Sequence, residues 1–321
     1  MARLDTGFGW PERLGSWKVR WGIGRMNYIV PPGLYAIGQP NPDDPVVVTA
    51  NYKMTFDIVR TALAGRSVWL LVLETYGINV WCAAGKGTFG TGELVRRVTS
   101  TGLARVVRHR RLILPILGAA GVSAHQVATR CGFSVQYAAI RAQDLPAYLD
   151  GGMKTMPAMK ELTFSLYERL VLIPVEVVLA LKTNLLIAAG LLLLGILAGG
   201  PAAGLAMSAA YLGAALTGIV AGPLLLPWLP SPSFAVKGGI AGLIWSVFFY
   251  LLAGGSAWNP PVTMAVFLAL PAVSAYYTLN FTGCTPYTSR SGVKKELRLG
   301  LPAMAAALLL GCVLLVLGKL V

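Results

Sequence analysis

A single cysteine followed by small residues is the part of the sequence with the clearest chemical potential. Residues 79–91 read Asn-Val-Trp-Cys-Ala-Ala-Gly-Lys-Gly-Thr-Phe-Gly-Thr, so Cys82 directly precedes Ala83, Ala84 and Gly85. A cysteine thiolate is a strong nucleophile and metal ligand, whereas a structural free cysteine is usually a small buried hydrophobe. Backbone with so little side-chain bulk can lie flat against a large planar ligand, and its entropic cost favours such a role. The segment is therefore predicted to bind a ligand, with simple packing as the alternative.

Two phosphate-binding motifs can be compared with the same residues. A Walker A loop would need glycine at Val80 and Ser or Thr at Gly87, so that motif is excluded. The letters Gly85-x-Gly87-x-x-Gly90 match the dinucleotide fingerprint. However, the strand expected at 68–73 ends well upstream, and the residues about twenty positions downstream are basic rather than acidic. We interpret this match as accidental.

Residues 79–86 carry a family resemblance. Asn-Val-Trp-Cys-Ala-Ala-Gly-Lys resembles the cap-helix motif of the membrane corrinoid protein of microbial mercury methylation, the HgcA family. Those proteins are related to the large subunit of the corrinoid iron-sulfur protein. The similarity extends to Val-Val-Val-Thr-Ala-Asn at 46–51, to Gly-Val-Ser-Ala-His at 121–125 and to a hydrophobic C-terminal half. It therefore covers most of the chain.

The resemblance implies a corrinoid-dependent methyltransferase that forms methylmercury from Hg(II) through a Cys-ligated methyl-cobalt intermediate. It makes Cys82 the catalytic residue and the lower axial ligand of the cobalt. Neither His109 nor His125 lies in the Asp-x-His-x-x-Gly pattern of histidine-ligated cobalamin modules; His125 is expected either to support the corrinoid edge or to be a core histidine. The residues expected to bind the corrinoid are Thr49, Asn51, Asn79, Val80, Trp81, Cys82, Ala83, Ala84, Gly85, Lys86, Gly87, Thr88, Phe89, Gly90, Gly121, Ser123 and His125.

The cysteine spacing limits the redox chemistry of the chain. Cys82, Cys131, Cys284 and Cys312 form no Cys-x-x-Cys pair, so no iron-sulfur cluster is expected in this chain. Electrons are therefore expected from a ferredoxin-type iron-sulfur reductant protein, and the methyl group from a methyl-donor methyltransferase. A disulfide is not expected in a cytoplasmic domain.

Strand and helix patterns alternate around the cysteine motif. Strands are predicted at 46–50, 68–73, 112–117 and 135–140, and helices at 54–64, 93–101 and 123–130. This alternation predicts an α/β corrinoid-binding domain with a parallel sheet covered by helices. Ligands of such sheets bind at the carboxyl ends of the strands. Residues up to Pro45 contain three tryptophans without clear periodicity, and no role is assigned to them.

The second half of the chain reads as membrane-spanning. Residues 183–236 and 238–289 contain no charged side chain, and such long apolar runs predict spanning helices. Breaks rich in Gly and Pro divide the region into about five helices. The predicted domains are a cytoplasmic corrinoid-binding domain at 1–155, a partly interfacial connecting helix at 156–182 and an all-α transmembrane domain at 183–321.

The few charges of this half predict its orientation. Lys237 and the basic residues at 290–298 fall on one side, whereas the loops around Gly200 and Trp258 are uncharged, which is the positive-inside pattern. Residues 1–25 contain no continuous apolar run, so no signal peptide is expected. We expect a multi-pass protein of the inner (cytoplasmic) membrane with its N-terminal domain in the cytoplasm. The net charge of +14 is ascribed to attraction to anionic membrane lipid, because no nucleic-acid recognition motif accompanies it.

Three interpretations of function remain open at this point. The first is mercury methylation, and the second is a corrinoid methyl carrier of one-carbon metabolism with a different native acceptor. The third is a membrane transporter with a regulatory domain, although polar residues in the spans are few and mild, which favours helix packing. The polar loop at 280–295 either contacts the soluble domain, its partner or the substrate, or is a solvated basic loop.

The charge asymmetry of the loops gives a first prediction. Reporter fusions after Ser291 should be cytoplasmic, whereas fusions after Gly255 should not, because positive loops are retained inside. Alkaline phosphatase and fluorescent protein activity of matched fusions measures this. The opposite pattern would place the N-terminal domain outside the cell.

Overall fold

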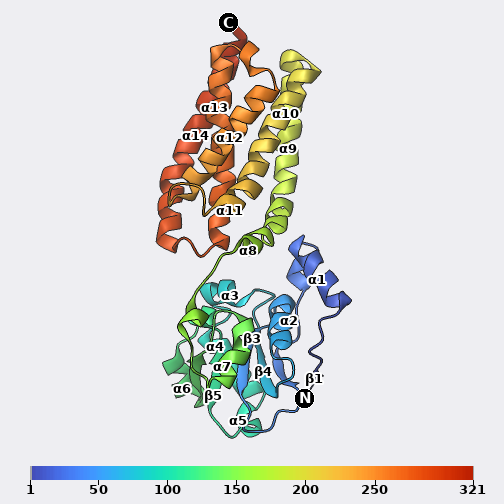
Figure 1. Ribbon diagram of the computed structural model, residues 1–321, viewed down its shortest axis with the longest axis vertical. Coiled ribbons are helices and arrows are strands. Elements are labelled where there is room, and N and C mark those ends of the chain that lie inside the picture. Colours follow the sequence, from blue (N-terminus) through green and yellow to red (C-terminus); the bar gives the residue numbers. More distant parts are fainter. Residues whose placement is uncertain (1, 321) are drawn as a thin grey trace. The chain divides into compact units, whose positions relative to one another are not determined.

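The chain folds into two compact units, Met1–Thr163 and Phe164–Val321. They are seen in a computed structural model that describes residues 2–320. The first unit contains a sheet with helices, and the second is helical throughout the part that is described (Figure 1). The two kinds of sequence pattern therefore correspond to two separately packed units.

The first unit is built on a six-stranded sheet with the order β1-β2-β4-β3-β5-β6. Strands β4, β3, β5 and β6 are mutually parallel, whereas β2 pairs with β4 in the antiparallel sense and β1 pairs with β2 in parallel. Every residue of β3 and β4 is buried, as expected for parallel strands covered on both faces. The strands are β1 Ala2–Leu4, β2 Gly33–Ile37, β3 Val46–Ala50, β4 Val68–Leu73, β5 Arg111–Leu114 and β6 Ser134–Tyr137.

Helices cover both faces of this sheet. Val46 and Val48 of β3 face one apolar core, which includes residues of α3, α4 and α6. Val47 faces the other core, which includes residues of α2 and α7. This division follows the two-residue period of a strand. The helices of the unit are α1 Trp10–Arg20, α2 Lys53–Ala62, α3 Val80–Lys86, α4 Thr91–Ser100, α5 Leu103–Val106, α6 Ala124–Cys131 and α7 Leu145–Asp150, with 3₁₀ turns at Arg25–Asn27, Ile116–Gly118, Ala142–Asp144 and Pro157–Lys160.

The predicted α/β architecture is confirmed, with one difference at its edge. All four predicted strands and all three predicted helices are present within a few residues of their expected bounds. The sheet is mixed rather than wholly parallel, because β2 pairs with β4 in the antiparallel sense. Strands β1 and β2 come from the first 45 residues, where the sequence shows no clear strand or helix periodicity. Strand β2 is only five residues long and follows Pro31 and Pro32. Its alternation of buried and partly buried residues is therefore too short to predict a strand from the sequence.

The described part of the second unit contains five helices long and apolar enough to cross a membrane, which confirms the expected number. The candidate spans are Leu166–Gly199, Pro201–Leu225, Phe234–Leu252, Pro260–Gly283 and Ser291–Gly318. Their helices are α8 Leu166–Leu170, α9 Ile173–Gly199, α10 Pro201–Leu216, α11 Gly222–Leu225, α12 Phe234–Leu252, α13 Pro260–Asn280 and α14 Arg290–Leu320, with a π-helical stretch at Thr217–Ala221 and 3₁₀ turns at Gly255–Ala257 and Phe281–Cys284.

The segment expected as one connecting helix, 156–182, is divided in the structure. It contains the turn Pro157–Lys160, helix α8 and the beginning of α9. Ser165 starts α8 with a capping box, since its hydroxyl accepts from the Glu168 N–H while the Glu168 carboxylate accepts from the Ser165 N–H. Pro174 lies in the first turn of α9, where its missing N–H costs nothing. Local capping therefore divides the segment for which apolar spacing predicted one continuous helix.

A polar network joins three of the candidate membrane helices. The Asn184 Oδ1 of α9 accepts hydrogen bonds from the Tyr211 hydroxyl of α10 at 2.8 Å and from the Tyr277 hydroxyl of α13 at 2.9 Å. The Asn184 amide also donates to the Ala180 carbonyl at 2.9 Å. The sequence places Asn184 among mildly polar packing residues, and the network confirms that role, because one side chain bonds two other helices.

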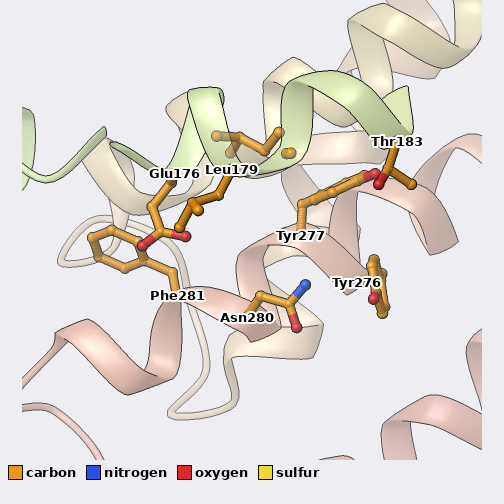
Figure 2. Close-up of a pocket in the computed structure, with 9 residues that line it drawn as sticks. Glu176, Leu179, Thr183, Tyr276, Tyr277, Asn280 and Phe281 are labelled. Carbon is orange, nitrogen blue, oxygen red and sulfur yellow. The ribbon is translucent and has the colours of Figure 1, made fainter. Parts of the chain in front are cut away.

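Polar side chains also line a small cavity of about 230 Å³ between α9 and α13. Glu176 and Thr183 come from α9, whereas Tyr276, Tyr277 and Asn280 come from the end of α13 (Figure 2). The cavity lies next to the network, since Tyr277 belongs to both. The side of α9 that lines this cavity is thus more polar than the runs of leucine in α9 indicate.

The network generates a stability prediction. Asn184→Leu should lower the stability of the second unit by about 1 kcal/mol, because two tyrosine hydroxyls lose their acceptor in an apolar environment. Thermal unfolding in detergent micelles measures the change, with the exposed neighbour substitution Leu185→Ala as the matched control. Equal stability of the two variants would contradict the role of the network.

Candidate functional site

Helix α3 carries the cysteine motif and has a defined beginning and end. The Asn79 side chain accepts a hydrogen bond from the Cys82 N–H at 2.9 Å, which caps the helix. Gly87 ends it in the left-handed conformation, with φ of 82°. Because the cap bond ends on the cysteine itself, the backbone of Cys82 is held in place although the helix has only seven residues.

The two faces of α3 differ in composition. Ala83 and Ala84 are buried against the core, so the lack of side-chain bulk partly serves packing. Cys82 is exposed on the outer face, as are Trp81, Gly85 and Lys86. A buried structural thiol was the alternative interpretation of Cys82, and its exposure argues against that alternative.

The loop that leads from β4 to α3 is held by a buried amide, Asn51. Its Nδ2 donates to Glu74 Oε1 at 2.7 Å, and its Oδ1 accepts from the Thr75 N–H at 3.0 Å and the Thr75 hydroxyl at 2.9 Å. The same oxygen accepts a longer bond from the Gly77 N–H. Asn51 was predicted to bind the ligand, and the structure places it beneath the loop that carries the cysteine helix.

A carboxylate on α4 holds the beginning of the same loop. Glu93 accepts from the Glu74 N–H at 2.9 Å and from the Arg96 and Arg97 side chains. Burial raises the pKa of Glu93, but the bonds from the Glu74 N–H, Arg97 and Arg96 outweigh it, so the pKa lies below its usual value. The carboxylate therefore stays ionised, and its ion pairs remain, at neutral pH. The supporting roles of Glu74 and Glu93 were not predicted from the sequence. The position of Glu74 directly after a buried strand was the one pattern that could have indicated a role at this edge of the sheet.

The glycines at 118–121 allow the loop after β5 to touch the residues that end α3. A Cβ on Gly121 would lie 2.2 Å from the Phe89 carbonyl and 3.0 Å from the Ala84 Cα, and one on Gly118 would meet the Phe89 ring at 2.6 Å. The Ser123 N–H donates to the Thr91 hydroxyl at 2.8 Å. Gly121 and Ser123 therefore lie beside the motif, as predicted, and only glycine fits at Gly121 without displacing backbone.

A cavity of about 330 Å³ opens between β3 and β5. The chain places β4 on one side of β3 and β5 on the other, so this is the switch point of the sheet, where ligands of such folds bind. Thr49 of β3, Pro115 after β5, and Asn79, Val80 and Trp81 at the beginning of α3 are among its lining residues. The cavity therefore adjoins the helix that carries Cys82.

Thr49 presents a polar atom that lacks a protein partner. The residue is 1% exposed, and its hydroxyl makes no hydrogen bond among the described residues. A buried hydroxyl without a partner is costly, and one that lines a cavity is suited to a ligand atom or a water. Thr49 is thus the predicted residue with the most direct structural indication of a binding role.

The two histidines lie in different environments. His109 accepts from the Arg111 N–H through Nδ1, and its Nε2 lies 2.8 Å from the Asp44 carbonyl, so both ring nitrogens have partners. His125 is exposed on α6, and its core-histidine alternative does not fit this exposure. The structure thus brings together residues 79–90, Thr49, Gly121 and Ser123, places Asn51 below them and leaves His125 at the surface.

The unpartnered hydroxyl generates a second stability prediction. Thr49→Val should stabilise the ligand-free protein by about 1 kcal/mol, because it removes a buried polar atom without a partner. Thr75→Val, the matched control, should destabilise it, because the Thr75 hydroxyl bonds Asn51 and the Ile78 carbonyl. Hydrogen exchange of the β3 amides in the full chain measures both. A loss of protection in Thr49→Val would show that its hydroxyl has a protein partner.

Part of the first unit is similar to subunits of CO dehydrogenase/acetyl-CoA synthase and of acetyl-CoA decarbonylase/synthase complexes. Residues 25–146 match the family described as CO dehydrogenase/acetyl-CoA synthase delta subunit. The acetyl-CoA decarbonylase/synthase complex subunit gamma of Archaeoglobus fulgidus is 38% identical over 92 residues, which are 28% of this chain and 20% of that protein. The subunit of the same name from Methanopyrus kandleri is 36% identical over 124 residues, 38% of this chain and 26% of that protein.

The match is limited to part of each protein. This chain spans about a fifth to a quarter of the length of these curated relatives. The matched residues 25–146 contain strands β2 to β6, helix α3 and the cavity, and they end before the membrane helices. The candidate site therefore lies in a domain similar to the CO dehydrogenase/acetyl-CoA synthase delta subunit.

Proposed function

We propose that this protein is a corrinoid-dependent methyltransferase that transfers a methyl group to Hg(II) and so forms methylmercury. The observation that carries the proposal is the exposed Cys82 on a capped helix at the carboxyl ends of the parallel strands of the sheet. The similarity of residues 25–146 to subunits of acetyl-CoA synthase complexes supports methyl-transfer chemistry more generally. The resemblance of the Trp81-Cys82 motif to the mercury-methylating family supports the acceptor.

The residues around Cys82 fit a corrinoid, which is a large planar macrocycle with polar side chains. Gly85 has no side chain to project from the outer face of α3, so a flat ligand could approach the backbone there. Trp81 offers an aromatic surface, and Thr49 offers a buried hydroxyl in the adjoining cavity. When bound, a corrinoid supplies a cobalt ion that accepts and releases a methyl group. The proposed binding residues are those of 79–90 with Thr49, Gly121 and Ser123, supported from below by Asn51 and at the edge by His125.

The chain's own contribution is to hold one thiolate in a fixed place. The Asn79 cap fixes the Cys82 backbone, and Asn51 fixes the loop that bears Asn79. As the proposed lower ligand of cobalt, Cys82 must lose its proton, since the thiolate is the form that binds metals. Cys82 would hold the cobalt through this thiolate, and the bound corrinoid would supply a methyl group that a soft acceptor such as thiolate-bound Hg(II) could take up.

The proposed cycle needs partners. No group of three His, Cys, Asp or Glu side chains suited to a metal ion occurs in the part of the chain that the structure describes. With no Cys-x-x-Cys pair in the sequence, we propose that a ferredoxin-type protein supplies electrons and that a separate methyltransferase supplies the methyl group. Sustained turnover without any added reductant would remove the need for the first partner.

A second candidate function is a corrinoid methyl carrier of one-carbon metabolism with another native acceptor. The names of the relatives favour it, because they are subunits of acetyl-CoA decarbonylase/synthase complexes. Both functions use the same site and the same cofactor. They differ in the acceptor, so methylmercury yield relative to methyl transfer to other thiolate or metal acceptors distinguishes them.

The decisive variant is Cys82→Ala. Alanine suits a helix and removes little volume from an exposed position, so fold and membrane insertion should be retained. The corrinoid absorption spectrum should change, and methylmercury formed per bound corrinoid should be lost. Both are measured anaerobically with the purified full chain and an added chemical reductant.

Matched variants separate the ligand role from general thiol effects. Cys131→Ala and Cys312→Ala should retain most activity, since Cys131 packs against the core and donates to the Val127 carbonyl on its own helix, and Cys312 lies on α14. An unaltered spectrum with a near-normal methylmercury yield from Cys82→Ala would defeat the axial-ligand assignment. The side chain of Cys284 lies outside the described part, so no result is assigned to its variant.

A further inference from the structure

Helix α1 exposes a stripe of large apolar side chains to solvent. The stripe consists of Trp10, Leu14 and Trp17 of α1 and of the C-cap residue Trp21, at intervals of four, three and four residues. At 100° per residue they fall within an arc of about 60° on the helix. Their exposed fractions are 64%, 39%, 54% and 52%. Trp10 and Trp17 contact each other edge to face, with ring centroids 5.6 Å apart, so the stripe is continuous.

The opposite face of α1 is fixed to the first unit, as its place beside α2 suggests (Figure 1). Val19 is 1% exposed, and Glu12 forms an ion pair with Arg60 of α2 at 3.5 Å. Arg60 also donates to the Asp5 and Gly7 carbonyls, which hold the segment before the helix. The buried Asp57 carboxylate positions Arg60, because its Oδ1 lies 2.8 Å from the Arg60 Nε.

This arrangement reverses the usual amphipathic pattern of a surface helix. A helix that only covers a soluble domain directs its apolar stripe inward. In α1 the stripe points outward, while polar contacts and one valine face inward. The anchoring excludes a simple rotation that would bury the tryptophans, because Glu12 and Val19 would then lose their partners.

Basic side chains border the stripe. On the same helical projection, Arg13 and Lys18 fall on opposite sides of it, and both are exposed. Lysine and arginine at such positions extend their charge toward phosphate while their carbon chains cover apolar surface. The only acidic residue of the helix, Glu12, belongs to the inner face. The outer surface of α1 thus combines tryptophan with positive charge.

We infer that α1 is an interfacial anchor, whose tryptophan stripe inserts into the surface of an anionic phospholipid bilayer. Tryptophan is enriched at membrane interfaces, and basic residues add attraction to anionic headgroups. The five candidate spans of the same chain keep the first unit close to a bilayer, which raises its effective concentration there. The inference does not rest on the proposed methyl transfer and can hold or fail without it.

The anchor gives the first unit a second attachment besides its connection to the spans. A single flexible connection leaves a domain free to rotate, whereas a helix fixed to both the bilayer and the sheet restricts its orientation. Because Arg60 and Asp57 lie on α2, which also lines the cavity through Thr55 and Ile58, the anchor is linked rigidly to the candidate site.

The test uses the full chain in lipid nanodiscs whose acyl chains are brominated near the headgroups, because bromine quenches tryptophan emission on contact. The variant Trp10→Phe/Trp17→Phe/Trp21→Phe retains aromatic rings at all three positions. The emission that it lacks relative to the wild-type chain therefore reports the three tryptophans alone. In discs that contain phosphatidylglycerol, this difference emission should be blue-shifted and largely lost on bromination.

Two controls make the result specific. Trp69→Phe removes a buried tryptophan of β4, and its difference emission should be equal in brominated and ordinary lipid. Arg13→Glu/Lys18→Glu should weaken the quenching of the stripe, as should replacing phosphatidylglycerol with phosphatidylcholine. If neither the charge-reversal variant nor the exchange for phosphatidylcholine reduces the quenching, the requirement for anionic lipid is overturned.

The remaining outcomes contradict the inference. Difference emission that is blue-shifted but unquenched would mean that protein covers the stripe, either the second unit of this chain or a partner. Red-shifted and unquenched emission would mean that the stripe remains in water. In each case α1 is not a bilayer anchor.

Discussion

The candidate site depends on one buried amide. Asn51 directly follows β3, and its side chain forms hydrogen bonds to Glu74, Thr75 and Gly77 of the loop that leaves β4. Buried amide groups are stable only when their donors and acceptors are paired, so this geometry is strongly specified. The loop in turn carries Asn79, which caps the helix of Cys82. The position of an exposed thiol is thus determined by a side chain that is wholly buried.

Close backbone approach supplies the second constraint. Gly118 and Gly121 let the loop after β5 touch Phe89 and Ala84, so that α3 is held from the side as well as from below. The arrangement is pre-organised, because the thiol needs no ordering of its own backbone when a ligand arrives. Rigid support combined with exposure fits a metal ligand that must be accessible on one face. Thr49 shows the opposite combination, a buried hydroxyl without a hydrogen-bond partner among the described residues.

The two halves of the chain solve different physical problems. The first buries continuous strands between two layers of helices, whereas the second satisfies its backbone within helices and adds a few shared polar contacts, such as Asn184 with two tyrosines. Helix α1 is bonded to the first unit through Glu12 and Arg60, but its exposed tryptophans resemble the residues of membrane interfaces. Its tryptophans are costly to expose in water, and this cost is removed when they meet a bilayer interface.

Much of this protein could be predicted from its sequence because the signals are local. Some signals depend on near neighbours in the sequence, such as the asparagine three residues before Cys82. Others depend on continuous apolar composition, such as the run 68–73 and the charge-free spans. The pairing of β2 against β4 could not be predicted, because five residues after two prolines give no readable period. The cavity, the unpartnered hydroxyl of Thr49 and the bonds of Glu93 to a loop nineteen residues earlier depend on which strands become neighbours. Only the tertiary structure decides such contacts, because they join residues whose separation along the chain carries no pattern.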